Sequence, residues 1–252
     1  MASWLNGCRE NGGLVSYALW GHNMVEMPSR TTLQIHDNSF ESHKQALDWN
    51  QEPDPPGDIG VGLSFFKDVL HAWDQSAAWR EIRSTLLSLP CYSRIHKVVG
   101  TACGDFVRFD PSNRRRAATR HALLITLKRT LQEVHLANAD VACYVQDPAY
   151  STMDRSVLES SEMHVVEDPD DFLEMDDRSL VFSCAPNICI KQIIADTAIA
   201  DYDFEYCRRR GSRLPQQMVQ EDYDAIPFPE DGDNFTDMTM YVKKQAQAFA
   251  GK

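Results

Sequence analysis

The sequence lacks the features that mark several large classes of protein. No apolar run approaches the roughly 20 residues that a membrane-spanning helix needs, and the start has no basic region followed by an apolar one. The seven cysteines show no CxxC spacing, and neither G-x-G-x-x-G nor a Walker phosphate loop occurs. We therefore expect a cytoplasmic protein in a reducing compartment, with no membrane contact, disulfide scaffold or dinucleotide fingerprint.

Basic residues are also scarce, since 25 Lys and Arg stand against 37 Asp and Glu and leave a net charge of -12. This balance argues against indiscriminate binding to nucleic acid, so an RNA-binding surface would need local basic patches. Two clusters qualify, although both are equally compatible with solvated helix ends: Arg114, Arg115, Arg116 and Arg120, and Arg208, Arg209 and Arg210. The eight histidines form no H-x-x-x-H pair, and we expect neither a metal nor a cofactor.

The chain has 252 residues, of which 43% are hydrophobic, and this is enough for one large α/β domain. We divide residues 1–252 into an irregular N-terminal segment (1–60), a core (64–196) and a C-terminal extension (197–252). Apolar stripes predict two helices between Ser64 and Pro90, with Ser64 and Asp74 as N-caps. A terminal helix is expected over Thr236–Phe249.

Strands and helices alternate through the core. Short apolar runs predict four strands, at residues 95–100, 141–146, 164–166 and 180–183. Helices are predicted between them at Arg115–His135, where Leu124, Leu127 and Leu131 form a stripe, and at Ser151–Ser160. This alternation predicts a Rossmann-like three-layer sandwich with a mostly parallel central sheet and helical N- and C-terminal additions.

In an open parallel sheet, ligands bind at the carboxyl ends of the strands. The polar, glycine and cysteine residues that follow the predicted strands are therefore candidates for substrate binding. These candidates are Gly100, Cys103, Asp105, Asp147, Tyr150, Ser183 and Asn187. A covalent intermediate would need a nucleophile, for which Ser183, Cys184 and Cys103 are available, and direct attack of one substrate on another would need none.

The segment after the third predicted strand, Glu167–Asp177, is strongly acidic. If it opens a helix, Asp170 and Glu174 lie on one face about a turn apart, with Asp171 beside them. Carboxylates held this close repel one another and need a cation, a shared proton or abundant water. The segment is either a solvated helix start, a magnesium site as a weaker alternative, or a catalytic site.

The pentapeptide Asp170-Asp171-Phe172-Leu173-Glu174 resembles the DDxxE motif of the fungal arginine-containing cyclodipeptide synthases. The resemblance implies an aminoacyltransferase of secondary metabolism, with arginyl-tRNA and a second aminoacyl-tRNA as partners. It implies that Asp170, Asp171 and Glu174 are catalytic and recognise a cationic group while moving protons. The similar motif of terpene synthases belongs to all-helical proteins, which the predicted strands exclude.

Residues 95–196 also resemble the sensitivity-to-red-light-reduced domain. The resemblance rests on Asp147-Pro148-Ala149-Tyr150 and on the turn that ends the strand from Leu180. That domain usually has Pro-His-Cys where this chain has Ala185-Pro186-Asn187. The alternatives to a synthase are thus a non-catalytic regulatory protein of this type, or an S-adenosylmethionine-dependent methyltransferase whose glycine loop is Gly100–Asp105.

Overall fold

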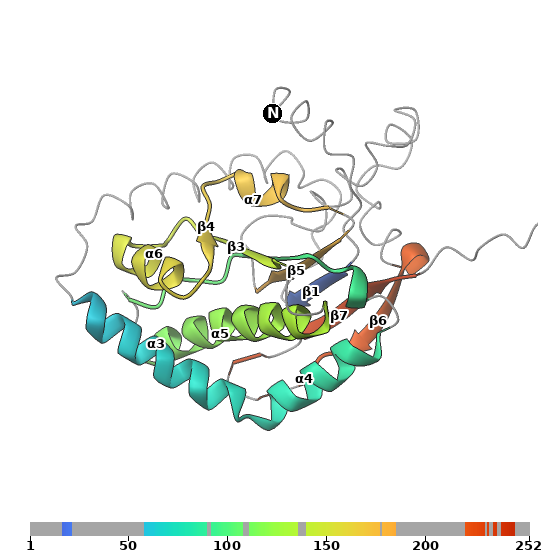
Figure 1. Ribbon diagram of the computed structural model, residues 1–252, viewed down its shortest axis with the longest axis horizontal. Coiled ribbons are helices and arrows are strands. Elements are labelled where there is room, and N and C mark those ends of the chain that lie inside the picture. Colours follow the sequence, from blue (N-terminus) through green and yellow to red (C-terminus); the bar gives the residue numbers. More distant parts are fainter. Residues whose placement is uncertain are drawn as a thin grey trace, which may run out of the picture.

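A computed structural model describes residues 17–21, 58–89, 92–107, 111–135, 140–176, 178–184, 220–229, 231, 234–235 and 238–244. Its elements are β1 (Tyr17–Gly21), α3 (Ile59–Asp74), α4 (Ala77–Ser88), a 3₁₀ turn η1 (Tyr92–Arg94), β2 (Lys97–Thr101), α5 (Pro111–Val134), β3 (Ala142–Gln146), α6 (Thr152–Glu159), β4 (His164–Val165), α7 (Asp170–Leu173), β5 (Ser179–Ser183), β6 (Tyr223–Pro227) and β7 (Met238–Lys243). They form a seven-stranded sheet in the order β4-β3-β2-β5-β1-β7-β6, with α5 and α7 on opposite sides of it (Figure 1).

The sheet is mostly parallel, as the sequence predicts. Neighbouring strands from β4 to β1 pair in parallel, whereas β7 pairs antiparallel with both β1 and β6. The chain winds outward from β2 through β3 to β4 and then returns to place β5 on the other side of β2. The carboxyl ends of β2 and β5 therefore flank the point where the winding reverses, which is where α/β sheets bind ligands.

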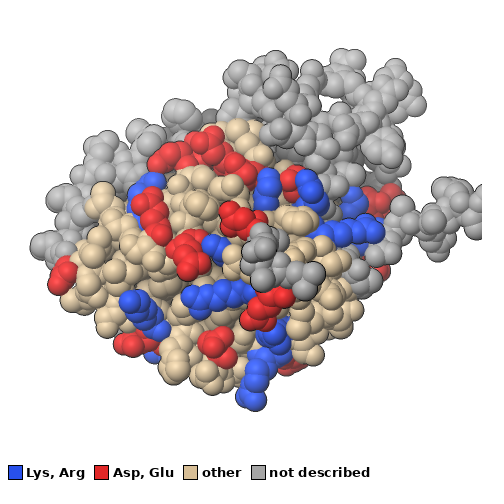
Figure 2. Space-filling view, viewed as in Figure 1, with Lys and Arg blue, Asp and Glu red and all other residues tan. Residues whose placement is uncertain are grey.

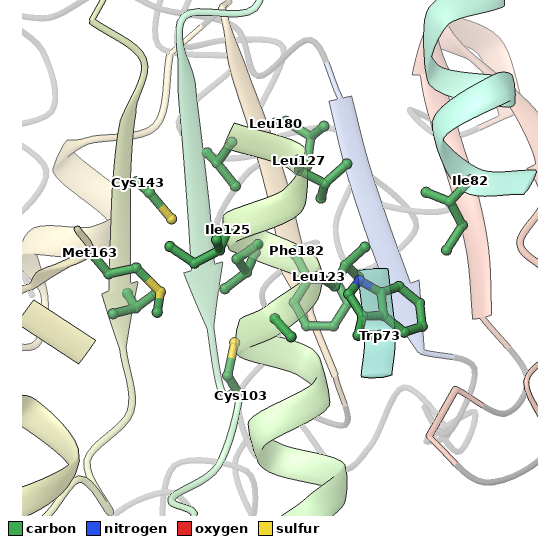
Figure 3. Packing of buried hydrophobic residues seen from close by; sticks show 14 of the residues in the cluster. Trp73, Ile82, Cys103, Leu123, Ile125, Leu127, Cys143, Met163, Leu180 and Phe182 are labelled. Atoms are coloured by element: carbon green, nitrogen blue, oxygen red, sulfur yellow. The ribbon is translucent and has the colours of Figure 1, made fainter. Parts of the chain in front are cut away.

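Helices α3, α4, α5 and α6 cover one face of the sheet with an apolar core. In β2, β3 and β5, the side chains that point into this core are those of Val98, Cys143, Val145, Leu180 and Phe182, all buried. They meet apolar side chains of α5 such as Leu123 and Leu127, and Trp73 of α3 lies beside them (Figure 3). Because side chains alternate along a strand, the residues that alternate with these in β2, β3 and β5 face the other way.

Helix α5 packs tightly against β2 at Gly100. A Cβ atom built on Gly100 would overlap Cδ1 of Leu124, so a side chain at this position of β2 requires the buried Leu124 side chain to move. Helix packing thus accounts for this glycine, which the sequence analysis assigned to substrate binding.

Several expectations outside the core differ from the structure. Residues 17–21 form a strand inside the sheet, in a segment to which the sequence analysis assigned no regular structure. The helix predicted over Thr236–Phe249 is wrong where the structure describes it, because β7 occupies Met238–Lys243. Its apolar residues recur at every second position and are buried, which is the period of a strand. Two further apolar runs, Leu33–His36, which is compatible with a strand, and Ile188–Ile194, which predicts a helix, lie outside the described residues.

The N-caps of the first two helices also differ from those predicted. Asp58 caps α3 by accepting the Gly60 N–H at 2.8 Å, and Ser76 caps α4 by accepting the Trp79 N–H at 3.0 Å. Ser64 lies within α3, and Asp74 is its last residue. Among the described residues, no helix combines the length and apolarity needed to cross a bilayer.

Candidate functional site

The second face of the sheet carries polar side chains at the carboxyl ends of three adjacent strands. Thr101 ends β2, and the register places Gln146 of β3 on one side of it and Ser183 of β5 on the other. All three are buried, and the Ser183 hydroxyl has no hydrogen-bond partner. We call Gln146, Thr101 and Ser183 the polar row. Its buried hydroxyl is unsatisfied, which costs free energy that an apolar side chain would avoid.

Helix α7 lies against β2 and β3 on this polar face. It brings the side chain of Asp171 to Thr101, and Asp171 is fully buried. Neither carboxylate oxygen has a hydrogen bond of acceptable geometry. Burial, with a smaller contribution from the charge of Asp168, raises the pKa of Asp171 to about 6, although the Thr101 hydroxyl and nearby backbone N–H groups oppose the rise. A carboxyl group with this pKa can accept and release a proton near neutral pH.

The other two acids of the motif lie in different surroundings. Asp170 is exposed to solvent. Glu174 is half-buried beside the opposite end of β2, where its Oε2 lies 3.5 Å from Nζ of Lys97. The structure therefore separates the three acids that the sequence analysis grouped together, and it brings Asp171 alone to the polar row.

Lys97 forms an ionic cluster with Glu174 and Asp176. Burial lowers the pKa of Lys97, but the hydrogen bond and charge of Asp176 and then those of Glu174 outweigh burial and raise it. Burial raises the pKa of Asp176, yet hydrogen bonds from the Arg178 N–H, Ser179 and Lys97 lower it overall. Lys97 and Asp176 are consequently charged throughout the neutral range.

The loop after β2 is held by an aspartate from the next strand end. Asp147 accepts the Gly104 N–H at 2.7 Å and the Ala149 N–H at 2.9 Å, so each of its carboxylate oxygens has a backbone donor. Both Ala102 (φ 55°) and Gly104 (φ 81°) have positive φ angles, and the Asp147 contact stabilises this turn. Burial raises the pKa of Asp147 although the two N–H groups oppose the rise. Asp147 thus has a structural role that is visible without a ligand.

Cys103 of this loop and Tyr150 belong to the core cluster. The Tyr150 hydroxyl donates to Nε2 of His121 at 2.7 Å, while Nδ1 of His121 lies 2.7 Å from the Ala117 carbonyl oxygen and therefore carries the proton. Burial lowers the pKa of His121 to about 4, so the ring is neutral. Asp105 is buried in the same loop.

The three candidate nucleophiles are not equivalent. Burial raises the pKa of the Cys103 thiol well above its ordinary value and also raises that of Cys184, which weighs against either thiolate as a nucleophile. Ser183 has a free hydroxyl within the polar row. Any covalent intermediate would therefore be placed on Ser183 rather than on a cysteine.

The predicted basic residues on α5 differ in their contacts. The Arg114 guanidinium stacks over the Phe65 ring at 4.0 Å, and Arg120 donates to the Cys103 carbonyl oxygen at 3.3 Å. Arg115 and Arg116 are exposed. They lie near the start of α5, which follows the loop at the carboxyl end of β2. Asn187, Arg208, Arg209 and Arg210 lie outside the described residues.

Thr101, Gln146 and Lys97 were not predicted from the sequence as residues of the site. A usable signal existed, because Thr101 follows Val99 at strand spacing and a polar residue at the last position of a parallel strand belongs to the ligand-binding edge. The partner of Lys97 had no comparable signal, since Glu174 is 77 residues away. Among the described residues, no group of three or more histidine, cysteine and acidic side chains is arranged to hold a metal ion.

The comparisons with known proteins give one match. Residues 82–202 match the SRR1 domain (sensitivity to red light reduced), which covers the second half of α4 and the chain through β5. No curated protein and no solved structure matches the chain. The matched range contains α7, the polar row and Lys97.

Proposed function

We propose that the chain is a tRNA-dependent cyclodipeptide synthase that joins arginine from arginyl-tRNA with a second amino acid from another aminoacyl-tRNA. The observation that carries the proposal is the DDxxE motif placed on α7, with Asp171 buried against Thr101 at the ligand-binding edge of the sheet. A carboxyl group whose pKa is about 6 is suited to removing a proton from an α-ammonium group near neutral pH.

The proposed reaction needs no ATP, because each substrate is already an activated ester. The α-amino nitrogen of one aminoacyl group attacks the ester carbonyl carbon of the other, and the bond from that carbon to the tRNA ribose oxygen breaks. The remaining amino group then attacks the second ester in the same way and closes the ring. Two ester bonds become two amide bonds, and both tRNAs leave. Asp171 accepts the proton lost by each amine and returns it to each departing ribose oxygen.

The charge distribution supports this assignment of substrates. Glu167, Asp168 and Asp170 are exposed, and acidic side chains form a band over α7 at the top of the view (Figure 2). Such a surface attracts the guanidinium of an arginyl group and repels a phosphate backbone. Arg115 and Arg116 are exposed at the start of α5 and offer positive charge to the tRNA.

The test is direct product detection. Purified full-length protein is incubated with arginyl-tRNA and a mixture of other charged tRNAs, and released small molecules are analysed by mass spectrometry. We expect an arginine-containing diketopiperazine that disappears when the tRNAs are digested with ribonuclease beforehand. Product that survives this digestion would refute the use of aminoacyl-tRNA, and absence of product with every charged tRNA would refute the synthase.

The SRR1 match favours a second candidate, a non-catalytic regulatory protein. This candidate predicts no turnover of any aminoacyl-tRNA. It also predicts that cells tolerate Asp171→Asn without loss of the regulatory phenotype, because the buried carboxylate then has no chemical task. Product formation that depends on Asp171 would exclude it.

A further inference from the structure

Helix α7 is too short to hold its own position. It spans four residues, and Pro169 at its N-cap provides no side-chain hydrogen bond. An isolated helical turn is unstable in water because fixing its backbone costs more than one hydrogen bond returns. Contacts with the sheet must therefore decide where α7 lies.

The end of α7 is fastened to the first residue of β2. Nζ of Lys97 lies 3.1 Å from the Glu174 carbonyl oxygen and 3.1 Å from Oδ2 of Asp176. Its third contact is the Glu174 carboxylate. On β5, Ser179 stands opposite Lys97, donates to Oδ1 of Asp176 at 2.9 Å and accepts the Asp176 N–H at 2.9 Å. We call Lys97 and Ser179, with their acceptors Glu174 and Asp176, the clamp.

The clamp and the polar row lie at opposite ends of one short strand. Lys97 and Thr101 are the first and last residues of β2 and point to the same face, about 13 Å apart at strand spacing. The two strands packed against α7 are β2 and β3, and their titratable side chains on this face are Lys97 and Tyr144. Asp168 precedes α7, and its negative charge contributes to the raised pKa of Asp171.

We propose that Lys97 is a positioning residue that keeps Asp171 buried by holding the C-terminal end of α7 against β2. Glu174 belongs to the same device, so the third acid of the motif acts through Lys97 and does not touch the substrate. The catalytic consequence rests on the proposed function, whereas the positioning itself does not.

The direction in which the pKa of Asp171 changes when Lys97 is replaced distinguishes a positioning role of Lys97 from a direct electrostatic effect. Removing a nearby cation destabilises a carboxylate and raises its pKa. If the loss of Lys97 instead releases α7, Asp171 gains water, and its pKa falls toward the ordinary value of about 3.9. Lys128 provides a matched control, because its Nζ also bonds a carbonyl oxygen (Glu162, 2.9 Å) and a carboxylate (Glu162, 3.6 Å), but it belongs to α5 on the other face of the sheet.

The experiment is a carboxyl ¹³C NMR titration of Asp171 in the full chain, with the signal assigned from Asp171→Asn. We expect the midpoint to fall from about 6 by at least one pH unit in Lys97→Met, and to stay within half a unit in Lys97→Arg and Lys128→Met. An unchanged or raised midpoint in Lys97→Met, or an equal fall in Lys128→Met, would overturn the proposal. If Lys97→Met does not fold, the double variant Glu174→Gln/Asp176→Asn removes both ion pairs of Lys97 and must also lower the midpoint.

The titration tests the positioning role of Lys97 and the product assay tests the synthase, so either claim can be refuted without the other. A lowered midpoint in Lys97→Met with no diketopiperazine from the wild type would support the positioning role and refute the synthase. Product formation by the wild type with an unchanged midpoint in Lys97→Met would support the synthase and refute the positioning role.

Discussion

The two faces of the central sheet are built from alternate residues of the same strands. They differ in composition and in the free energy of burying their side chains. Towards α5, β2 and β5 present Val98, Leu180 and Phe182, together with a glycine that lets the helix approach. At their carboxyl ends they present Thr101 and Ser183 towards α7, where Asp171 is buried and neither of its carboxylate oxygens has a hydrogen bond of acceptable geometry. Burial of the first set stabilises the fold, whereas burial of the second set costs free energy. A cost of this kind is typical of residues kept for function.

The largest expected effect is on the apolar face. Phe182 is fully buried and meets the Phe235 ring edge-on, with ring centroids 6.2 Å apart. Phe182→Ala should lower the free energy of unfolding by about 3 to 5 kcal/mol, because it removes buried surface and leaves a cavity. Urea denaturation measures this change. A loss below about 1 kcal/mol would mean that this face does not hold the fold together.

Asp171→Asn should have an intermediate effect in the opposite direction. The pKa of Asp171 is raised from 3.8 to about 6 in the folded chain, so the stability contributed by its protonated form is present below about pH 4 and is lost as the pH rises through about 6. At pH 7.5 the ionised Asp171 lowers the free energy of unfolding of the wild type by roughly 2 to 3 kcal/mol. The amide of Asp171→Asn is neutral and avoids most of this loss.

Urea denaturation of both proteins from pH 4 to pH 8 tests this prediction. The stability advantage of Asp171→Asn should grow between about pH 4 and pH 6 and level off above pH 7. A difference between the two proteins that does not change with pH would contradict the burial of this carboxylate. Asp170→Asn is the matched control, because Asp170 is the adjacent residue and is exposed.

The smallest effect is expected at the residue that follows Phe182. Ser183→Ala removes a buried hydroxyl that has no partner, so it should leave stability unchanged or raise it by less than about 1 kcal/mol. Thermal unfolding of Ser183→Ala and of Phe182→Ala provides the comparison, since the two residues are adjacent in β5 and face opposite sides of the sheet. A large destabilisation by Ser183→Ala would show that the hydroxyl supports the fold.

The parts of the fold that the sequence predicted are those with strong local signals. Apolar runs located β2, β3, β4 and β5, and the leucine stripe located α5. Three strands of the sheet, β1, β6 and β7, were not predicted. Tyr17–Gly21 is short, and nothing in its flanking sequence marks a strand; its place between β5 and β7 depends on pairing with residues more than 160 positions away. Met238–Lys243 was read at helical spacing, although Met238, Met240 and Val242 alternate with more polar residues.

The candidate site was predicted in its location but not in its division of roles. The sequence placed the acidic motif after the third strand of the core, and α7 lies there. Sequence spacing alone does not distinguish the roles of Asp170, Asp171 and Glu174. Their differences come from long-range contacts, because Asp171 meets Thr101 and Glu174 meets Lys97, each about 70 or more residues earlier in the chain. Helical periodicity carries no information about such partners.

The measurement that tests the central claim most directly is the rate of diketopiperazine formation by the wild type, Asp171→Asn and Asp170→Asn between pH 5 and pH 9. If Asp171 is the proton acceptor, the wild-type rate should rise with pH through about 6 and then level off, because the carboxylate is the active form. Asp171→Asn should lose about 100-fold or more and should lack this rise, while Asp170→Asn should keep it. An Asp171→Asn protein as active as the wild type, or a wild type that forms no product, would contradict the account.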